Sequence, residues 1–230
     1  MELYSDELIS ANLAFRGGTA LNKLFLKNPY RYTEDLDFVQ IKAGDIGAVL
    51  TVLRRIIRNV IPSKPKYNKS KIANTLIYYY TAENPPNSKM RIKIEINTRE
   101  HLAFDGIRTI KQECISDWFT GLADIVTYSA EELLATKLRA LYQRSKGRDL
   151  FDLWVSRELN HNPQRTIEIF KLYLENENLS IAKKDFTDNL NDKFADAVFR
   201  NDIIPLIRQS SEYDIKKAFE YVHDTYLLHL

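Results

Sequence analysis

The sequence predicts an α+β protein in which strands come first and most helices follow. Residues 90–97 alternate apolar and polar side chains without a break, as in a strand with one buried face. After about residue 120 the apolar spacing changes to the 3.6-residue period of amphipathic helices. Strands followed by helices are typical of α+β folds, so we expect a mixed β-sheet with flanking helices and then a C-terminal helical bundle.

The N-terminal half contains further segments of each kind. Residues 36–41 and 76–80 are rich in β-branched and aromatic side chains, which favour strands. A paired glycine precedes a predicted helix at 20–27, and a second helix is predicted at 48–60. We place the boundary of this half at residue 120, giving a sheet domain over residues 1–120 and a helical domain over residues 121–230.

The first predicted helix of the C-terminal half begins with an N-terminal capping motif. Ser129 stands three residues before Glu132, the spacing of a capping box in which each side chain binds the backbone N–H of the other residue. The helix that follows carries leucines on one side, and Gly147 lies in its connection to a helix that begins at Arg148. Later helices are predicted around 164–176, 184–199 and 213–228.

Composition excludes several classes of protein. The chain has 230 residues, of which 44% are hydrophobic, enough for one large domain or two small ones. A single cysteine, Cys114, excludes an internal disulfide framework and a multi-cysteine zinc site. No apolar run approaches the roughly 20 residues needed to span a bilayer, and the N-terminus lacks a signal-peptide pattern. We therefore expect a cytoplasmic protein that does not associate with membranes.

Charge is distributed unevenly although the formal net charge is only +2. Between Asp45 and Glu83 there is no acidic residue. Such a stretch either contacts the phosphates of RNA or is simply a solvated basic face, and both interpretations stay open. The candidate RNA-binding residues in it are Arg54, Arg55, Arg58, Lys64, Lys66 and Lys69.

The densest chemical signal is a paired glycine followed by a pair of aspartates. Gly17 and Gly18 precede a predicted helix, where backbone N–H groups can approach an anion closely. Asp35 and Asp37 are two residues apart in a predicted strand, so their side chains leave the same face. Either motif alone is more often a plain turn or a solvated strand edge, but their order along the chain favours a functional site.

A third carboxylate can join the aspartate pair. Glu95 lies on the polar face of the predicted strand at 90–97, and it reaches Asp35 and Asp37 if the two strands are neighbours. Carboxylates placed side by side repel one another unless a cation lies between them, and Mg²⁺ held by carboxylates and substrate phosphates resolves this. A glycine turn facing such a cluster is typical of phosphoryl or nucleotidyl transfer.

These motifs resemble those of the AbiEii/AbiGii toxin family, within the DNA polymerase beta-like nucleotidyltransferase superfamily. The resemblance rests on residues 15–21 (FRGGTAL) and 33–37 (TEDLD), and on two later motifs at 131–141 and 148–153. It extends over nearly the whole chain. It implies a nucleotidyltransferase sheet whose active-site cleft is completed by the helical domain.

The resemblance also implies roles for individual residues. Metal ligands would be Asp35, Asp37 and Glu95, although many polymerases carry Asp at the third position. Lys137 would contact the nucleotide phosphates rather than extend along the surface, and Asp152 is favoured over Asp149 as a residue needed for activity. The implied nucleotide-binding residues are Gly17, Gly18, Thr19, Lys137 and the further candidate Arg31.

The implied reaction is transfer of NMP from an NTP to an acceptor, with Mg²⁺ or Mn²⁺ as cofactor and loss of pyrophosphate. Relatives in this group act in type IV toxin–antitoxin systems and abortive infection, and some extend the 3′ end of tRNA. We therefore expect a tRNA acceptor and a cognate antitoxin encoded nearby. Two alternatives stay open: transfer to a small molecule or a protein, and a catalytically silent nucleotide-binding module.

Overall fold

The computed structural model describes residues 1–33, 35–83, 86–117, 119–208 and 212–230. Glu34, which belongs to the aspartate motif, lies outside these ranges. The chain divides into two compact units. The first comprises residues 1–19, 34–103 and 107–128, and the second comprises residues 20–33, 104–106 and 129–230. Each is described below by itself.

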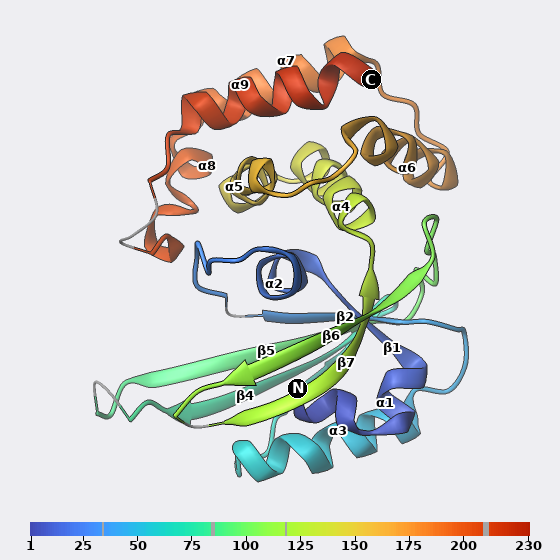
Figure 1. Ribbon diagram of the computed structural model, residues 1–230, viewed down its shortest axis with the longest axis vertical. Coiled ribbons are helices and arrows are strands. Elements are labelled where there is room, and N and C mark those ends of the chain that lie inside the picture. The colour runs from blue at the N-terminus through green and yellow to red at the C-terminus, as the bar shows by residue number, and fades with distance from the viewer. Residues whose placement is uncertain (34, 84–85, 118, 209–211) are drawn as a thin grey trace. The chain divides into compact units, whose positions relative to one another are not determined.

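The first unit is built on one mixed sheet. Among the described residues, seven strands pair in the order β3-β4-β5-β2-β1-β7-β6 (Figure 1). β2 lies near the centre, antiparallel to β1 and parallel to β5. The strands are β1 (Leu13–Arg16), β2 (Asp35–Gln40), β3 (Lys66–Lys69), β4 (Ala73–Thr81), β5 (Lys89–Asn97), β6 (Ile107–Ile115) and β7 (Thr120–Tyr128).

Helices α1 (Glu7–Asn12) and α3 (Gly47–Val60) cover one face of this sheet (Figure 1). The inner side of α3 buries Val49, Leu50 and Leu53, and the sheet contributes Leu76 and Ile94 to the same core. Since neighbours in register share a face, the pairing of Leu76 with Ile94 places Lys93 and Glu95 on the opposite face. The alternation predicted for residues 90–97 thus separates a buried face from a polar one.

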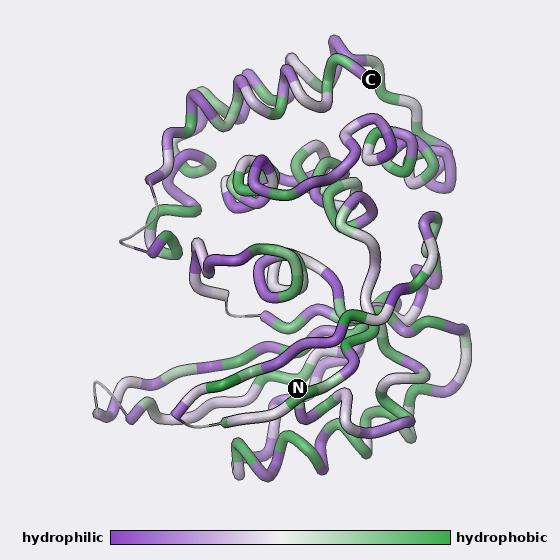
Figure 2. Tube along the Cα trace, viewed as in Figure 1, coloured by the Kyte–Doolittle hydropathy of each residue, from purple (hydrophilic) through white to green (hydrophobic). Residues whose placement is uncertain are grey.

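The second unit consists of helices. Two of its longer helices, α7 and α9, alternate hydrophobic and hydrophilic residues along their length, as helices with one apolar side do (Figure 2). On α9 this side buries Ala218 and Val222, and Tyr226 follows one turn later. The helices are α4 (Ala130–Gln143), α5 (Gly147–Val155), α6 (Pro163–Asn176), α7 (Lys183–Ala195), α8 (Ala197–Asn201) and α9 (Ile215–Thr225).

The start of α4 confirms half of the predicted capping box. The Ser129 hydroxyl accepts a hydrogen bond from the Glu132 N–H at 3.1 Å. The Glu132 carboxylate does not complete the box, because it accepts instead from the N–H groups of Phe104 and Asp105 at 2.8 and 2.9 Å, and from the Tyr173 hydroxyl at 2.8 Å. Glu132 is fully buried. It therefore ties residues 104–106 to the helical unit, although the chain on both sides of them belongs to the sheet unit.

Four of the described strands were missed by the sequence analysis. β1, β3 and β6 were not predicted, and β7 occupies residues where we expected helical periodicity to begin. The sequences of β6 and β7, IRTIKQECI and TGLADIVTY, alternate apolar and polar residues less regularly than that of β5, so the period-two signal is weak. The boundary predicted between residues 120 and 121 consequently falls at the first residues of β7. The helix predicted at 20–27 begins earlier, as α2 (Gly17–Ala20), and continues as a π-helical segment over Leu21–Phe25.

Within the described ranges, no helix is both long enough and apolar enough to cross a membrane.

Replacing Glu132 with Ala should lower the free energy of unfolding by about 3 kcal/mol, because it leaves buried N–H and hydroxyl donors without an acceptor. Denaturant titration measures this loss. Glu175→Ala, an exposed change on α6, is the control and should change stability by less than about 0.5 kcal/mol. Equal stability of both variants would contradict the role given to Glu132.

Candidate active site

The glycine turn lies directly against the aspartate pair. Gly17 has a φ of +78°, a conformation that favours glycine, and a Cβ at this position would lie 2.6 Å from Oδ2 of Asp37. The Thr19 hydroxyl donates to the backbone carbonyl of Asp35 at 2.7 Å. The backbone of the turn and the aspartate strand are therefore held together from two sides.

The three predicted metal ligands come together on one face of the sheet. β2 and β5 are parallel neighbours, with Asp35 opposite Lys93 and Asp37 opposite Glu95. Asp35 and Glu95 keep 34% and 42% of their side-chain surface exposed, so a ligand in solution can reach them. The expectation that Glu95 lies beside the aspartates is confirmed by this register.

Lys93 lies among these carboxylates and was not identified from the sequence as a site residue. Its ammonium is 3.4 Å from Oδ2 of Asp35 and 3.3 Å from Oε2 of Glu95. Burial lowers the pKa of Lys93, but the charges of Glu95, Asp35 and Asp37 raise it, and the net change is upward. Lys93 is thus a charged counter-ion within the cluster.

The aspartate pair fits a divalent metal ion. Asp35 and Asp37 offer the hard oxygen donors that Mg²⁺ prefers, and Mg²⁺ held by one or two carboxylates takes its other ligands from water and substrate phosphates. Among residues with described positions, no three carboxylate, histidine or cysteine side chains are arranged to hold one ion. Lys93 contacts both Asp35 and Glu95, at 3.4 and 3.3 Å. Direct ligation by Glu95 therefore stays a prediction.

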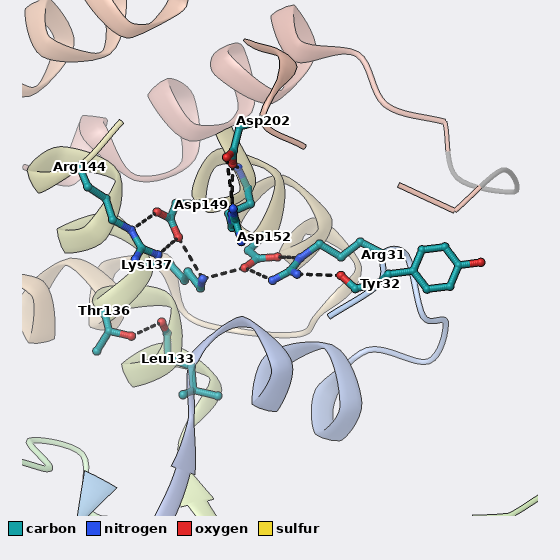
Figure 3. Close-up of polar contacts among 10 residues, drawn as sticks. Arg31, Tyr32, Leu133, Thr136, Lys137, Arg144, Asp149, Asp152 and Asp202 are labelled. Atoms are coloured by element: carbon teal, nitrogen blue, oxygen red, sulfur yellow. Dashed lines mark hydrogen bonds and ion pairs between the residues drawn. The ribbon is translucent and has the colours of Figure 1, made fainter. Parts of the chain in front are cut away.

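A second group of charges lies in the helical unit, where Arg31, Lys137, Asp149 and Asp152 are buried and Arg144 has 54% of its side chain exposed (Figure 3). Lys137 on α4 is 3.0 Å from Oδ1 of Asp149 and 2.8 Å from Oδ2 of Asp152. Arg31 binds Asp152 through two nitrogens, at 2.7 and 3.0 Å, and Arg144 binds Asp149 in the same way at 2.7 and 2.9 Å. Asp149 and Asp152 lie one turn apart on α5, which directs both carboxylates toward α4.

These contacts shift the titration of the group. Burial raises the pKa of Asp152, but Arg31 and Lys137 lower it more, and it lies well below its usual range. Burial likewise raises the pKa of Asp149, while Lys137 and Arg144 lower it to below its ordinary value. The pKa of Lys137 is lowered by burial and raised by Asp152 and Asp149, with a net increase. All the members of the group are therefore ionised at neutral pH.

Lys137 is only 6% exposed, so it does not extend along the surface. Arg148 on α5 binds Asp202 at 3.1 Å through its Nε. Asp149 was the second choice after Asp152, and Arg144 was not predicted as a residue of this site. The signal for Asp149 was its spacing three residues before Asp152, which puts both on one side of a helix.

The predicted site residues thus form two groups, one in each unit. The sheet unit holds Gly17, Gly18, Thr19, Asp35, Asp37 and Glu95, and the helical unit holds Arg31, Lys137 and Asp152. The predicted RNA-binding residues are all in the sheet unit but do not share one face. Lys66 pairs with Ile77 and so shares the face of Lys93 and Glu95, whereas Lys69 pairs with Asn74 on the face covered by α3.

Comparison with known proteins gives a consistent result. A family model described as "Nucleotidyl transferase AbiEii toxin, Type IV TA system" matches residues 2–224. Among solved structures, the nucleotidyltransferase toxin MenT4 from Mycobacterium tuberculosis H37Rv matches with a TM-score of 0.57 and 16% identity, over 96% of this chain and 89% of MenT4. This likeness shows the fold.

An antigenic nucleotidyltransferase-like protein from Paracoccidioides brasiliensis also matches at 16% identity, over 91% of this chain and 84% of its own. Its TM-score of 0.40 is too low to carry an argument. No curated protein matches the chain.

Gly17→Ala should displace Asp37, because the new methyl group collides with its carboxylate and the backbone angle at residue 17 is unfavourable for alanine. We expect a loss of about 1–3 kcal/mol in unfolding free energy together with weakened Mg²⁺ binding, measured by denaturant titration and calorimetry. Gly44→Ala is the control, since a Cβ there meets only Gln40 Nε2 at 4.0 Å. Unchanged Mg²⁺ binding in Gly17→Ala would refute the close approach.

Asp152→Asn should lower the free energy of unfolding by about 3 kcal/mol at pH 7, because it leaves buried cations without their anion. A carboxyl group whose pKa is depressed in the folded protein stabilises it above the pKa of the unfolded chain, about 4, and this contribution is lost as the pH falls. The difference in unfolding free energy between wild type and Asp152→Asn should therefore become smaller below about pH 4. Denaturant titrations from pH 7 to pH 2 measure it. A difference in unfolding free energy that does not depend on pH would contradict the assigned ion pairs. Asp188→Asn, an exposed change on α7, is the control and should have the unfolding free energy of wild type at every pH.

Proposed function

The chain belongs to the AbiEii family of type IV toxin–antitoxin nucleotidyltransferases, and we propose that it transfers NMP from an NTP to the 3′ end of a tRNA. The family predicted from the motifs is confirmed, and with it the nucleotidyltransferase activity and the toxin class. The metal dependence and the tRNA acceptor are the parts that we propose.

One observation carries the proposed chemistry. The backbone of Gly17 is packed against Asp37, and Asp37 lies beside Glu95 on the neighbouring strand. A bound NTP would thus place its phosphates at the backbone of Gly18 and Thr19, next to the carboxylates. Asp35 and Asp37 would hold Mg²⁺ or Mn²⁺, and this metal would neutralise charge on the phosphates as it develops during the reaction.

The reaction then needs an activated acceptor. A hydroxyl of the acceptor attacks the α-phosphorus of the NTP, the bond to the β-phosphate oxygen breaks, and pyrophosphate leaves. Glu95 would accept the proton of the attacking hydroxyl, because its carboxylate is partly exposed and lies beside Asp37. Lys93 would keep Glu95 and Asp35 in place until the substrate binds.

The group of charges in the helical unit suits a role in phosphate binding. It contains the three cations Arg31, Lys137 and Arg144 against two carboxylates, and so has a formal charge of +1. Lys137 has three N–H donors, and its contacts to Asp149 and Asp152 use two of them. The third would donate to the triphosphate, with Asp152 as the residue that positions Lys137 and Arg31.

The identity of the acceptor rests on resemblance and charge. Relatives that extend tRNA would block aminoacylation and stop growth, which agrees with the toxin class of the family. A type IV system also implies an antitoxin as the partner that restores growth. Transfer to a protein or to a small molecule is the competing outcome of the experiment below.

The test is incubation of the protein with each labelled NTP, Mg²⁺ and separate pools of cellular RNA, protein and small metabolites. We expect label in the tRNA fraction. Asp37→Asn should reduce the rate more than roughly 100-fold, since even residues that only support metal ligands contribute 10–100-fold. Asp124→Asn, an exposed change on β7, should leave the rate unchanged. Label in protein or metabolites would reject the tRNA acceptor, and a fully active Asp37→Asn would reject the metal site.

A further inference from the structure

The sheet unit contains a basic cavity on the face opposite the carboxylates. It has a volume of about 370 Å³ and lies between the C-terminal half of α3, the segment that follows it, and β4. No acidic residue lies among those that line it in the described part of the chain. The polar lining residues used below are Arg54, Arg55, Arg58, Ser63, Lys64 and Tyr78.

Some cations of this cavity already contact another side chain, and others do not. Arg55 forms an ion pair with Asp6 at 2.9 Å, and Arg54 lies over the ring of Tyr67 with its guanidinium carbon 4.9 Å from the centroid. Arg58 follows Arg54 by one helical turn, so the two side chains leave α3 on the same side. Within the described ranges, neither Arg58 nor Lys64 has an ion-pair partner. These two cations are available to an anion.

Tyr78 supplies an independent indication that a ligand binds. Its side chain is 1% exposed, and its buried hydroxyl has no hydrogen-bond partner among the described residues. Leaving such a group unsatisfied costs about 1–3 kcal/mol, so buried hydroxyls without a partner are uncommon and call for an explanation. Burial raises the pKa of Tyr78, more than Arg54 lowers it, and the hydroxyl therefore stays protonated as a donor.

The surroundings favour an extended polyanion over a small anion. A second cavity of about 650 Å³ opens toward the other end of α3, and its lining includes the three cations Lys69, Lys71 and Arg99 against one carboxylate, Asp45. Tyr67 connects the two, because it lies under Arg54 and its hydroxyl donates to Asn74, which lines the second cavity, at 2.6 Å. Two basic cavities joined by an exposed aromatic ring suit a nucleic-acid strand, which carries phosphates at regular intervals.

We propose that the cavity beneath α3 binds a phosphate group through Arg58, Lys64 and the Tyr78 hydroxyl, and that this phosphate belongs to the backbone of the acceptor RNA. The RNA source rests on the proposed function, whereas the phosphate site does not. Because Tyr78 and Glu95 lie on opposite faces of the sheet, the site holds RNA at a distance from the reacting atoms. Loss of the site should raise KM for the acceptor and leave kcat nearly unchanged.

The first measurement is a titration of ¹⁵N-labelled protein with inorganic phosphate, followed through the amide shifts of residues 58–64 and 78. Wild type should show saturable shifts there. The double change Arg58→Gln with Lys64→Gln should abolish them, and Tyr78→Phe should weaken binding about three- to tenfold without lowering the thermal midpoint, since it removes only a hydroxyl without a partner. Lys184→Gln is the control, because Lys184 is an exposed lysine on α7 and lies outside the basic stretch. Absent shifts, or equal shifts in wild type and all variants, would overturn the site.

The second measurement is RNA affinity and KM across a salt series. The double variant should lose about 0.7 from the slope of log K against log salt for each lost phosphate contact, whereas Lys184→Gln should keep the wild-type slope and the wild-type KM for RNA. Phosphate binding at the cavity with identical RNA slopes in wild type and double variant would reject RNA as the source of the phosphate. Transfer to a protein in the labelling experiment would reject the proposed acceptor but would leave phosphate binding at the cavity intact, so the two failures are distinguishable.

Discussion

Electrostatic repulsion between side-by-side carboxylates is the constraint on which the sheet unit depends. The parallel pairing of β2 with β5 forces Asp37 next to Glu95, and Asp35 follows one position along the same face. Lys93 offsets part of the charge of the three carboxylates, and Arg16 lies opposite Asp37 on β1. The carboxylates of Asp35 and Glu95 stay partly exposed, so their oxygen atoms remain accessible to a ligand.

The helical unit solves the same electrostatic problem differently. Its two carboxylates, Asp149 and Asp152, are fully buried, and each contacts at least two cationic nitrogen atoms. Burying a charge is costly unless it is paired, so neither aspartate is available to hold a metal ion while these pairs persist. The group has an excess of positive charge instead. The sheet unit therefore exposes its carboxylates, whereas the helical unit pairs its buried carboxylates with cations.

The sequence predicted those features that depend on local spacing. The alternation at 90–97, the same-face aspartates and the helix at 48–60 all follow from period two or period 3.6, and the structure confirms them. Features set by partners distant in the chain were not predictable. Arg31 binds Asp152, which lies 121 residues away in the sequence. Glu132 binds the backbone of Phe104 and Asp105 instead of completing the expected capping box. Lys93 was visible as a polar residue, but only the register with Asp35 shows that it is a counter-ion.

Protection of the sheet edge is an alternative to ligand binding as the explanation for the basic residues. Individual residues distinguish the two explanations. Edge strands present unpaired backbone groups, and lysines commonly protect them from pairing with another chain. β3 is such a strand, with all four residues exposed, so edge protection accounts for Lys66 and Lys69. It does not account for Arg58 on α3 or for the buried hydroxyl of Tyr78 on β4, neither of which lies on the edge. A polar atom buried without a partner contributes nothing to solubility and costs stability, so its retention at the wall of a basic cavity is better explained by a ligand than by protection of the edge.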